Sequence, residues 1–179
     1  MAESFVNSVT RAVGVVTSSS AGSVGVQTNL ITGITTTNVT VGDIVDNGNF
    51  IAGTKVSSIG VNSTTVDRDS TNTTAASSQS VKYLGLTTAY TSASGTKSII
   101  IGGTFANNTP NEVELTVHLY DNSATATPAI ISRVPVPQGS SFVLSDTGKT
   151  VLEGLDAIRV YCDTANGVDV QLGILKGVS

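Results

Sequence analysis

Short runs of β-branched and aromatic residues, separated by Gly, Pro, Asn or Asp, fill the C-terminal half of the chain. Apolar and polar residues alternate in 112–120, with Val113, Leu115, Val117 and Leu119 on one side and Glu112, Glu114, Thr116 and His118 on the other. A period of two places one face of a strand on a core and the other in water. Runs of the same character are 98–101, 130–131, 141–144, 157–161 and 168–172. This spacing predicts a sandwich or a closed barrel, and we expect 96–179 to form an antiparallel, jelly-roll-like β-sandwich domain.

The segment 29–85 predicts a small β-module. Its candidate strands, punctuated by Gly and Asn, are 30–31, 38–41, 43–45, 55–59 and 64–67. The pair Asn47-Gly48 predicts a tight turn between two of them, because both residues tolerate a positive φ.

The first 28 residues predict an N-terminal arm. Phe5, Val9, Val13 and Val16 fall near helical spacing, whereas the valines, Gly14 and the serines that follow disfavour a helix. Either a short helix or an added strand fits, and in an assembly we expect the arm to lie on a neighbour. Polar stretches at 69–80 and 90–96 are linker candidates, and we place the linker between the two modules at 86–95.

Composition supports an all-β chain. Thr and Val favour strands, Ser, Asn and Gly supply turns, and charged residues make up only 12 % of the 179 residues. Aromatic residues are 4 % and Trp is absent, so the cores must be built from Val, Ile, Leu and Ala. Small β-domains with thin cores often depend on partner subunits for stability.

Charge and apolar runs restrict the partners. A net charge of −4 with sparse Lys and Arg argues against nucleic-acid binding. The sequence shows neither a secretory signal nor a run of 18 apolar residues, so we expect no membrane partner. The single Cys162 has no second cysteine to pair with and is predicted to be a small core residue. These features favour synthesis in a reducing cytoplasm.

His118 is the only histidine, and it shares a strand face with Glu112 and Glu114. Such a pair could bind a metal or carry protons, but one His without a carboxylate or Cys cluster makes a poor metal site. We favour a cross-strand or intersubunit contact.

An oxygen-rich segment surrounds Gly48 and contains Asp43, Asp46, Asn47 and Asn49. Calcium accepts such ligands, but the twelve-residue calcium-loop spacing with its final Glu is missing. A turn in which these side chains bond their own backbone explains them better.

Catalytic patterns are also missing from the sequence. It contains neither a Gly-x-Ser-x-Gly elbow nor a phosphate-binding Gly-rich loop, and Glu112, Glu114 and Glu153 have turn or surface explanations. Asn-x-Ser/Thr triplets, for example at Asn38, Asn62, Asn72 and Asn107, are expected by chance in so Ser/Thr-rich a chain. We therefore predict no enzyme activity, catalytic residue, metal ligand or cofactor.

Two segments resemble known families. Residues 41–45, 50–59 and 62–66 resemble a short β-module that recurs in virion proteins of tailed bacteriophages. Residues 135–144, 150–160 and 166–170 look like a domain common in phage structural proteins, with a proline-rich approach, a small-residue turn, a strand, and then Leu-Glu-x-Gly-Asp-x-Ile. Leu155 precedes Asp156 where that pattern has Gly, and Cys162 stands where a polar or small residue is more usual. The resemblance implies a virion β-sandwich without enzymatic role.

On this basis we expect a non-enzymatic virion protein that decorates or cements a capsid. Its partners would be the major capsid protein or other virion proteins, and copies of itself. Thr- and Val-rich strands with few Lys are poorly protected against edge pairing, and a cyclic homotrimer would bury such edges. The alternatives are a neck, collar or tail protein, and a host-surface adhesin or carbohydrate-binding module.

Overall fold

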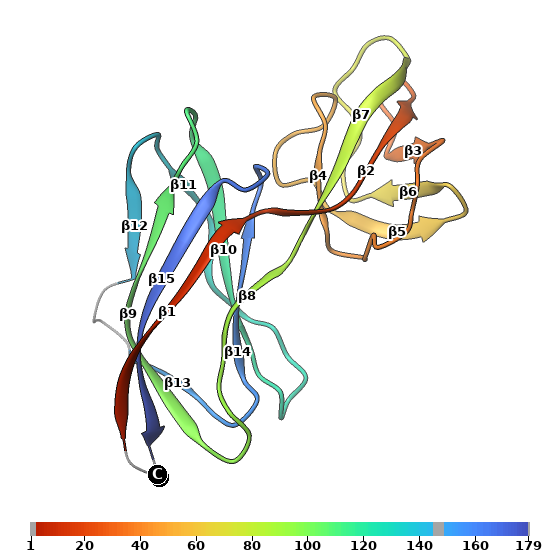
Figure 1. Ribbon diagram of the computed structural model, residues 1–179. Coiled ribbons are helices and arrows are strands. Elements are labelled where there is room, and N and C mark those ends of the chain that lie inside the picture. The colour runs from red at the N-terminus through yellow and green to blue at the C-terminus, as the bar shows by residue number, and fades with distance from the viewer. Residues whose placement is uncertain (1–2, 145–148, 179) are drawn as a thin grey trace. The chain divides into compact units, whose positions relative to one another are not determined.

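The computed structural model describes residues 3–144 and 149–178 (Figure 1). All the secondary-structure elements assigned within these residues are strands. The all-β prediction is confirmed. The described residues contain no helix that is long and apolar enough to cross a membrane.

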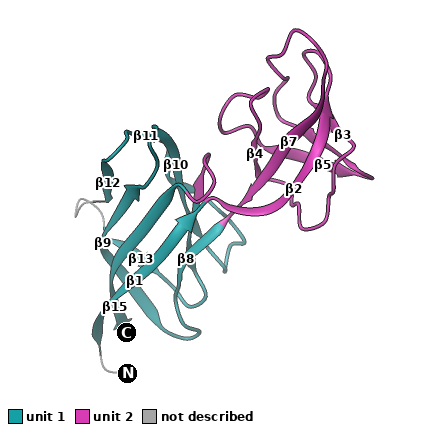
Figure 2. Cartoon of the chain, turned by 45° about the horizontal axis from the view of Figure 1, so that its top comes forward, with its two compact units in different colours: residues 1–13, 87–160, 167–179 teal, residues 14–86, 161–166 magenta. Residues whose placement is uncertain are grey.

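The chain divides into two compact units (Figure 2). Unit 1 contains the described residues of 1–13, 87–160 and 167–179, and unit 2 contains 14–86 and 161–166. These boundaries differ from the predicted arm, module, linker and C-terminal domain. Unit 2 is inserted into unit 1 after its first strand, and the predicted arm is shared between the two units. Each unit is described separately below.

Unit 1 contains two antiparallel sheets. The front sheet has the order β1-β15-β9-β12, and β13 pairs with the same strand, β9, as β12 does. Its strands are β1 (Ser4–Val13), β9 (Lys97–Asn107), β12 (Ser141–Leu144), β13 (Thr150–Leu152) and β15 (Val168–Val178). The back sheet has the order β11-β10-β14-β8. Its strands are β8 (Thr87–Thr91), β10 (Val113–Tyr120), β11 (Ala129–Val136) and β14 (Ala157–Cys162).

Apolar side chains from both sheets are buried, which makes unit 1 sandwich-like. Phe105, Leu172 and Ile174 are buried from the front sheet, and Leu115 and Ile158 from the back sheet. Hydrogen bonds also join the sheets. The Asn107 Nδ2 donates to the Val136 carbonyl at 2.8 Å, and the Ser8 hydroxyl donates to the Ala89 carbonyl at 2.9 Å.

The alternation predicted for β10 is confirmed at Val113, Leu115 and Val117, which are buried. Two residues depart from it. Thr116 on the opposite face is also buried, and its hydroxyl accepts a hydrogen bond from the Arg133 amide. Leu119, expected on the buried face, is only half-buried. The pairing of β10 with β11 shifts register on both sides of Val117, so the simple period of two ends there.

Unit 2 is built on one sheet with the order β4-β7-β2-β3-β6-β5. Its strands are β2 (Val15–Val24), β3 (Leu30–Thr32), β4 (Ile44–Asp46), β5 (Val56–Gly60), β6 (Ser63–Val66) and β7 (Ala76–Gly85). An isolated bridge between Ile44 and Lys55 connects the two ends of the sheet. Neither sheet of unit 1, for which the sequence predicted a sandwich or a closed barrel, closes on itself.

The core of unit 2 is made chiefly of valine and isoleucine, as its composition predicts. Tyr83 and Phe50 are the large exceptions. The Tyr83 hydroxyl shares a 2.7 Å hydrogen bond with Thr64. Burial raises the pKa of Tyr83 above its ordinary value, and the bond to Thr64 partly offsets this.

Three local predictions are corrected by the structure. The predicted arm forms strands β1 and β2, which agrees with the added-strand alternative, but these strands pair within their own chain, β1 with β15 and β2 with β7, whereas the arm was expected to lie on a neighbour. The linker placed at 86–95 contains β8, an edge strand of the back sheet. The strand expected at 38–41 is a turn, in which Asn38 has a φ of 64° and the Val39 amide bonds the Thr36 carbonyl.

Candidate interaction surface

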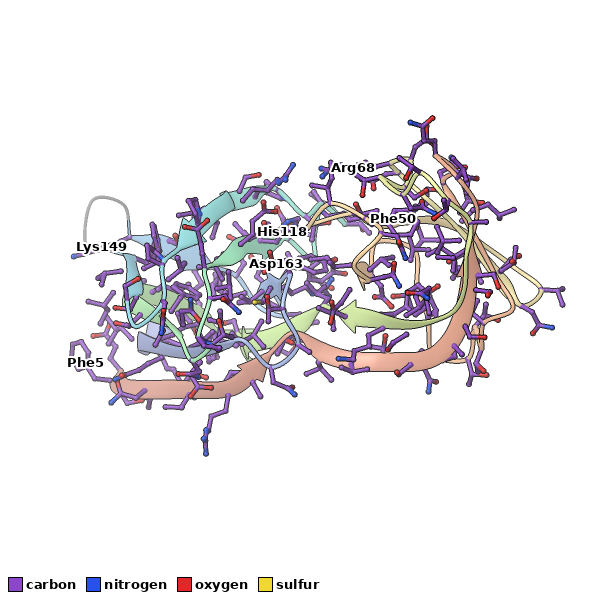
Figure 3. The ribbon with its side chains drawn as sticks, turned by 90° about the horizontal axis from the view of Figure 1, so that it is seen from above. Phe5, Phe50, Arg68, His118, Lys149 and Asp163 are labelled. Atoms are coloured by element: carbon purple, nitrogen blue, oxygen red, sulfur yellow. The ribbon has the colours of Figure 1, made fainter. Side chains whose placement is uncertain are left out.

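The outward side of the front sheet carries rows of residues that the strand register aligns. The first row crosses the sheet as Phe5, Leu175, Ile99 and Val151, each paired with the next. All four side chains are apolar. The outer residues of the row, Phe5 and Val151, are 76 % and 50 % exposed. Figure 3 shows Phe5 at the beginning of β1, with its ring clear of the ribbon.

Two further rows lie beside the first, nearer the C-terminal end of β1. The second is Asn7, Gly173 and Gly102, and the third is Val9, Gln171, Thr104 and Val143. Val9 and Val143 are 66 % and 56 % exposed. We call the residues of these three rows the front face. An outward sheet face normally carries polar and charged side chains, whereas the front face is uncharged and largely apolar.

Two ion pairs border these rows. Next to the third row, the Arg11 Nε lies 3.7 Å from the Asp169 carboxylate. Asp169 also accepts a 2.9 Å hydrogen bond from the Ala12 amide. Beside the first row, the Lys97 Nζ lies 3.8 Å from the Glu153 carboxylate. The front face therefore lies between two ion pairs of zero net charge.

A hollow of about 480 Å³ opens on the front face. Its lining includes Phe5, Gly102, Gly173 and Gln171, and it lies over the row in which two of the three residues are glycines. Because glycine adds no side chain, the middle of the sheet is lower than the rows on either side. The face thus combines a protruding aromatic ring with a depression.

This arrangement suits recognition by shape and apolar burial. None of the front-face residues named above titrates, so the face supplies no acid, base or nucleophile. Burial of its apolar area contributes about 25 cal/mol per Å² removed from water. Exposed contiguous apolar patches of this kind mark interaction sites.

The residues that the sequence singled out for chemistry lie elsewhere. Glu114 accepts two hydrogen bonds from the Arg133 guanidinium of the neighbouring strand β11, at 2.8 and 3.0 Å. The described residues hold no group of three or more His, Cys, Asp or Glu placed to share a metal ion. Cys162 is buried, as predicted, with its sulfur 3.9 Å from the Asp163 carboxylate.

The oxygen-rich segment around Gly48 bonds its own protein. Both Asp43 oxygens accept hydrogen bonds from Thr40, and one of them also accepts from Thr17. The Asn47 side-chain oxygen accepts from the amide of Asn49, and its nitrogen donates to the Ser80 carbonyl. The predicted turn is present and is closed by the Phe50 amide on the Asn47 carbonyl. It forms without a positive φ at Asn47 or Gly48, which differs from the geometry expected for that pair.

The sequence analysis missed the front face, although a signal was present. Successive residues, which point to opposite faces of a strand, are apolar in Ile99-Ile100-Ile101 and in Leu172-Gly173-Ile174-Leu175. Strands that are apolar on both sides are typical of sheets covered on both faces. The outward members of these runs, Ile99 and Leu175, are adjacent in the first row.

The chain is thus an all-β protein with an exposed apolar sheet face. A scan against protein-family models, a search of curated proteins and a search of solved structures each found no match to the chain.

Proposed function

We propose that this chain is a non-enzymatic structural protein of a tailed-phage virion, and specifically a decoration or cement protein that binds the assembled head. The observation that carries the proposal is the front face, an uncharged apolar surface on a sheet whose other side already covers a complete core. A chain built this way gains stability by being covered. The resemblance of 41–66 and 135–170 to phage virion modules supports the same role.

The fold proposed with this role is jelly-roll-like, and the strand pairing in unit 1 supports it. The pairs are nested along the chain: β1 with β15, β8 with β14, β9 with β12 and β13, and β10 with β11. One long hairpin rolled into two sheets produces this order, and viral capsid domains include jelly rolls. Unit 2 is then an insertion between the first and second strands of the roll.

The mechanism is multivalent binding. In the proposed homotrimer, unit 1 supplies the contacts between copies, and unit 2 contacts the major capsid protein. Each contact is weak, but linking several of them raises the overall affinity without any single strong site. Because the protein binds the assembled lattice and not free subunits, it stabilises that state by about 2.7 kcal/mol per site at a hundredfold excess over Kd.

The test is to purify virions of the phage that encodes this sequence and to quantify the chain by mass spectrometry. A decoration protein is present in copy numbers comparable with the capsomers. Heads stripped of it should break at lower temperature, and added purified protein should restore them. Virions that lack the chain would overturn the proposal. About a dozen copies, matching the symmetry of the neck, would replace decoration by the neck or tail alternative.

A further inference from the structure

Two glycines of the front face, Gly102 and Gly173, have room for a side chain, and the pairing of β15 with β9 shifts register just beyond them. A side chain built on Gly102 would meet only the Leu144 carbonyl at 3.4 Å, and one on Gly173 only the Gly102 carbonyl at 3.8 Å. Both are ordinary contact distances, and neither residue has a positive φ. Glycine inside a strand costs about 0.5–1 kcal/mol relative to alanine. It often marks a place where another molecule approaches closely.

Gly103 provides the contrast. A Cβ built on Gly103 would lie 2.7 Å from the Leu172 Cδ2, so the packing of unit 1 itself requires glycine there. The core thus explains Gly103, whereas the two glycines that form the floor of the hollow lie beside a register shift and have no close contact that excludes a side chain. Their effect is to leave about 480 Å³ open beside Phe5.

The chemistry of the face selects its occupant. A chain of net charge −4 repels its own copies, but least where the surface is neutral. The three rows are uncharged, and the ion pairs beside them, Arg11–Asp169 and Lys97–Glu153, each contain both signs. Two identical faces therefore meet without burying an unpaired charge. The face also carries both a protruding ring and a hollow, and a copy of itself supplies the complement of each.

We propose that the front face packs against the front face of another copy of this chain, with Phe5 of one copy seated in the glycine-floored hollow of the next. This inference rests on the proposed function for why copies are brought together, and it identifies the surface through which they meet. Because the same face is used on both copies, the contact is isologous and joins two copies about a two-fold axis, so the contacts of the proposed trimer lie elsewhere on unit 1.

The dimensions of the face set the strength of the contact. Four strand positions about 4.8 Å apart and six residues at about 3.4 Å each give a face of about 15 by 20 Å. That is smaller than the roughly 800 Å² per partner of a standard stable interface. The contact between two isolated copies is therefore weak, and we expect it in the range of tens to hundreds of micromolar.

The experiment is sedimentation velocity of the full chain in a dilution series up to about 0.5 mM. Four forms are compared: the natural chain, Phe5→Lys, Gly173→Val and Val61→Lys. Val61 lies in unit 2 and is 92 % exposed, which makes it a matched control for a charge placed on an exposed apolar residue. We expect the natural chain and Val61→Lys to associate alike, and Phe5→Lys and Gly173→Val to raise the dissociation constant at least about tenfold.

Gly173→Val also separates a binding effect from a folding effect. Valine favours strands, and its Cβ would meet only the Gly102 carbonyl, at 3.8 Å, so the variant should melt at the same temperature as the natural chain or higher. Loss of association in a variant of undiminished stability supports the face as the contact. A natural chain that stays monomeric throughout the series, or association that Phe5→Lys and Gly173→Val leave unchanged, would overturn the inference.

The same variants distinguish this inference from the proposed function. If the chain is found in virions but the front-face variants associate normally, the inference fails and the virion role stands. If virions lack the chain but the purified protein associates through Phe5, the inference stands and the virion role fails. If the chain is monomeric and the variants lose only their attachment to heads, the occupant is a capsid protein and the inference is wrong.

Discussion

The two outward faces of unit 1 belong to one sandwich-like unit but differ in chemistry. On the back sheet, Glu114 and Arg133 form a two-pronged ion pair, and the Arg159 guanidinium stacks 3.7 Å above the Tyr120 ring. On the front sheet, the aligned rows carry Phe5, leucine, isoleucine and valines. The back face follows the alternation expected of an antiparallel sheet in water, and the front face does not.

The core of unit 1 does not account for this difference. Both sheets cover the same core with their inner residues, so the outward residues were free to be polar on either side. Polar groups on the back face are used within the chain, as in the contacts of Glu114 with Arg133 and of Arg159 with Tyr120. Apolar groups on the front face have only each other, which is the pattern of a surface kept for contact with another molecule.

The largest expected effect compares the two sides of the front sheet. Phe105 is fully buried and stacks against Phe142 with ring centroids 6.3 Å apart, whereas Phe5 is three-quarters exposed. Phe105→Ala should lower the free energy of unfolding by about 3–5 kcal/mol through lost burial and a cavity. Phe5→Ala should change it by less than about 0.5 kcal/mol at concentrations where the chain is monomeric. Urea unfolding followed at the amides of β9 and β15 measures both, and a large loss in Phe5→Ala would mean that the front face belongs to the core.

A second comparison uses adjacent glycines of β9. Gly103→Ala should destabilise unit 1 by about 1–3 kcal/mol, because its methyl group would press on Leu172. Gly102→Ala should be neutral or stabilise by up to about 1 kcal/mol, because it restricts the unfolded chain without a clash. Thermal unfolding of the two variants side by side gives the sign. Equal losses would show that the hollow is a requirement of the fold.

The sequence predicted the local elements of unit 1 better than their organisation. Alternation in 113–117 located a strand with one buried face, and the structure confirms it. The insertion of unit 2 was out of reach, because it depends on Ser4 pairing with Lys176 at nearly opposite ends of the chain. No local periodicity encodes such a pairing. The separation of β1 from β8 by a whole unit made residues 1–28 look like an arm.

The candidate surface was hidden for a related reason. Phe5 and Val9 are four residues apart, which fits one face of a helix and one face of a strand equally well. Only the register places Leu175 beside Phe5 and Ile99 beside Leu175, so the apolar row exists in space and not in the sequence. The residues that attracted attention instead, His118 and the Asp43–Asn49 segment, are polar groups within strands and turns.

A smaller effect should come from the back face. The Glu114–Arg133 pair is partly exposed, with 24 % and 48 % of the two side chains accessible, so solvent screens it. We expect a coupling of about 0.2–1 kcal/mol from a double-mutant cycle of Glu114→Ala and Arg133→Ala, declining with added salt. The matched change on the front face, Val9→Thr, should alter unfolding by less than about 0.5 kcal/mol and be insensitive to salt. Salt dependence in both would remove the contrast between the faces.

The smallest effect is a pH dependence at the turn between β10 and β11. Hydrogen bonds to the Asp121 carboxylate, first from the Ala124 amide and then from the Ser123 hydroxyl, lower the pKa of Asp121 below its ordinary 3.8. A carboxyl group whose pKa is lower in the folded state stabilises the fold above 3.8 and loses that contribution as the pH falls through its folded pKa. Asp121→Asn, which keeps the shape without the charge, should therefore melt with a shallower dependence on acid pH than the natural chain. An NMR titration should place Asp121 below the other exposed carboxyls; a normal pKa there would show that this turn of the back sheet is not held by its carboxylate.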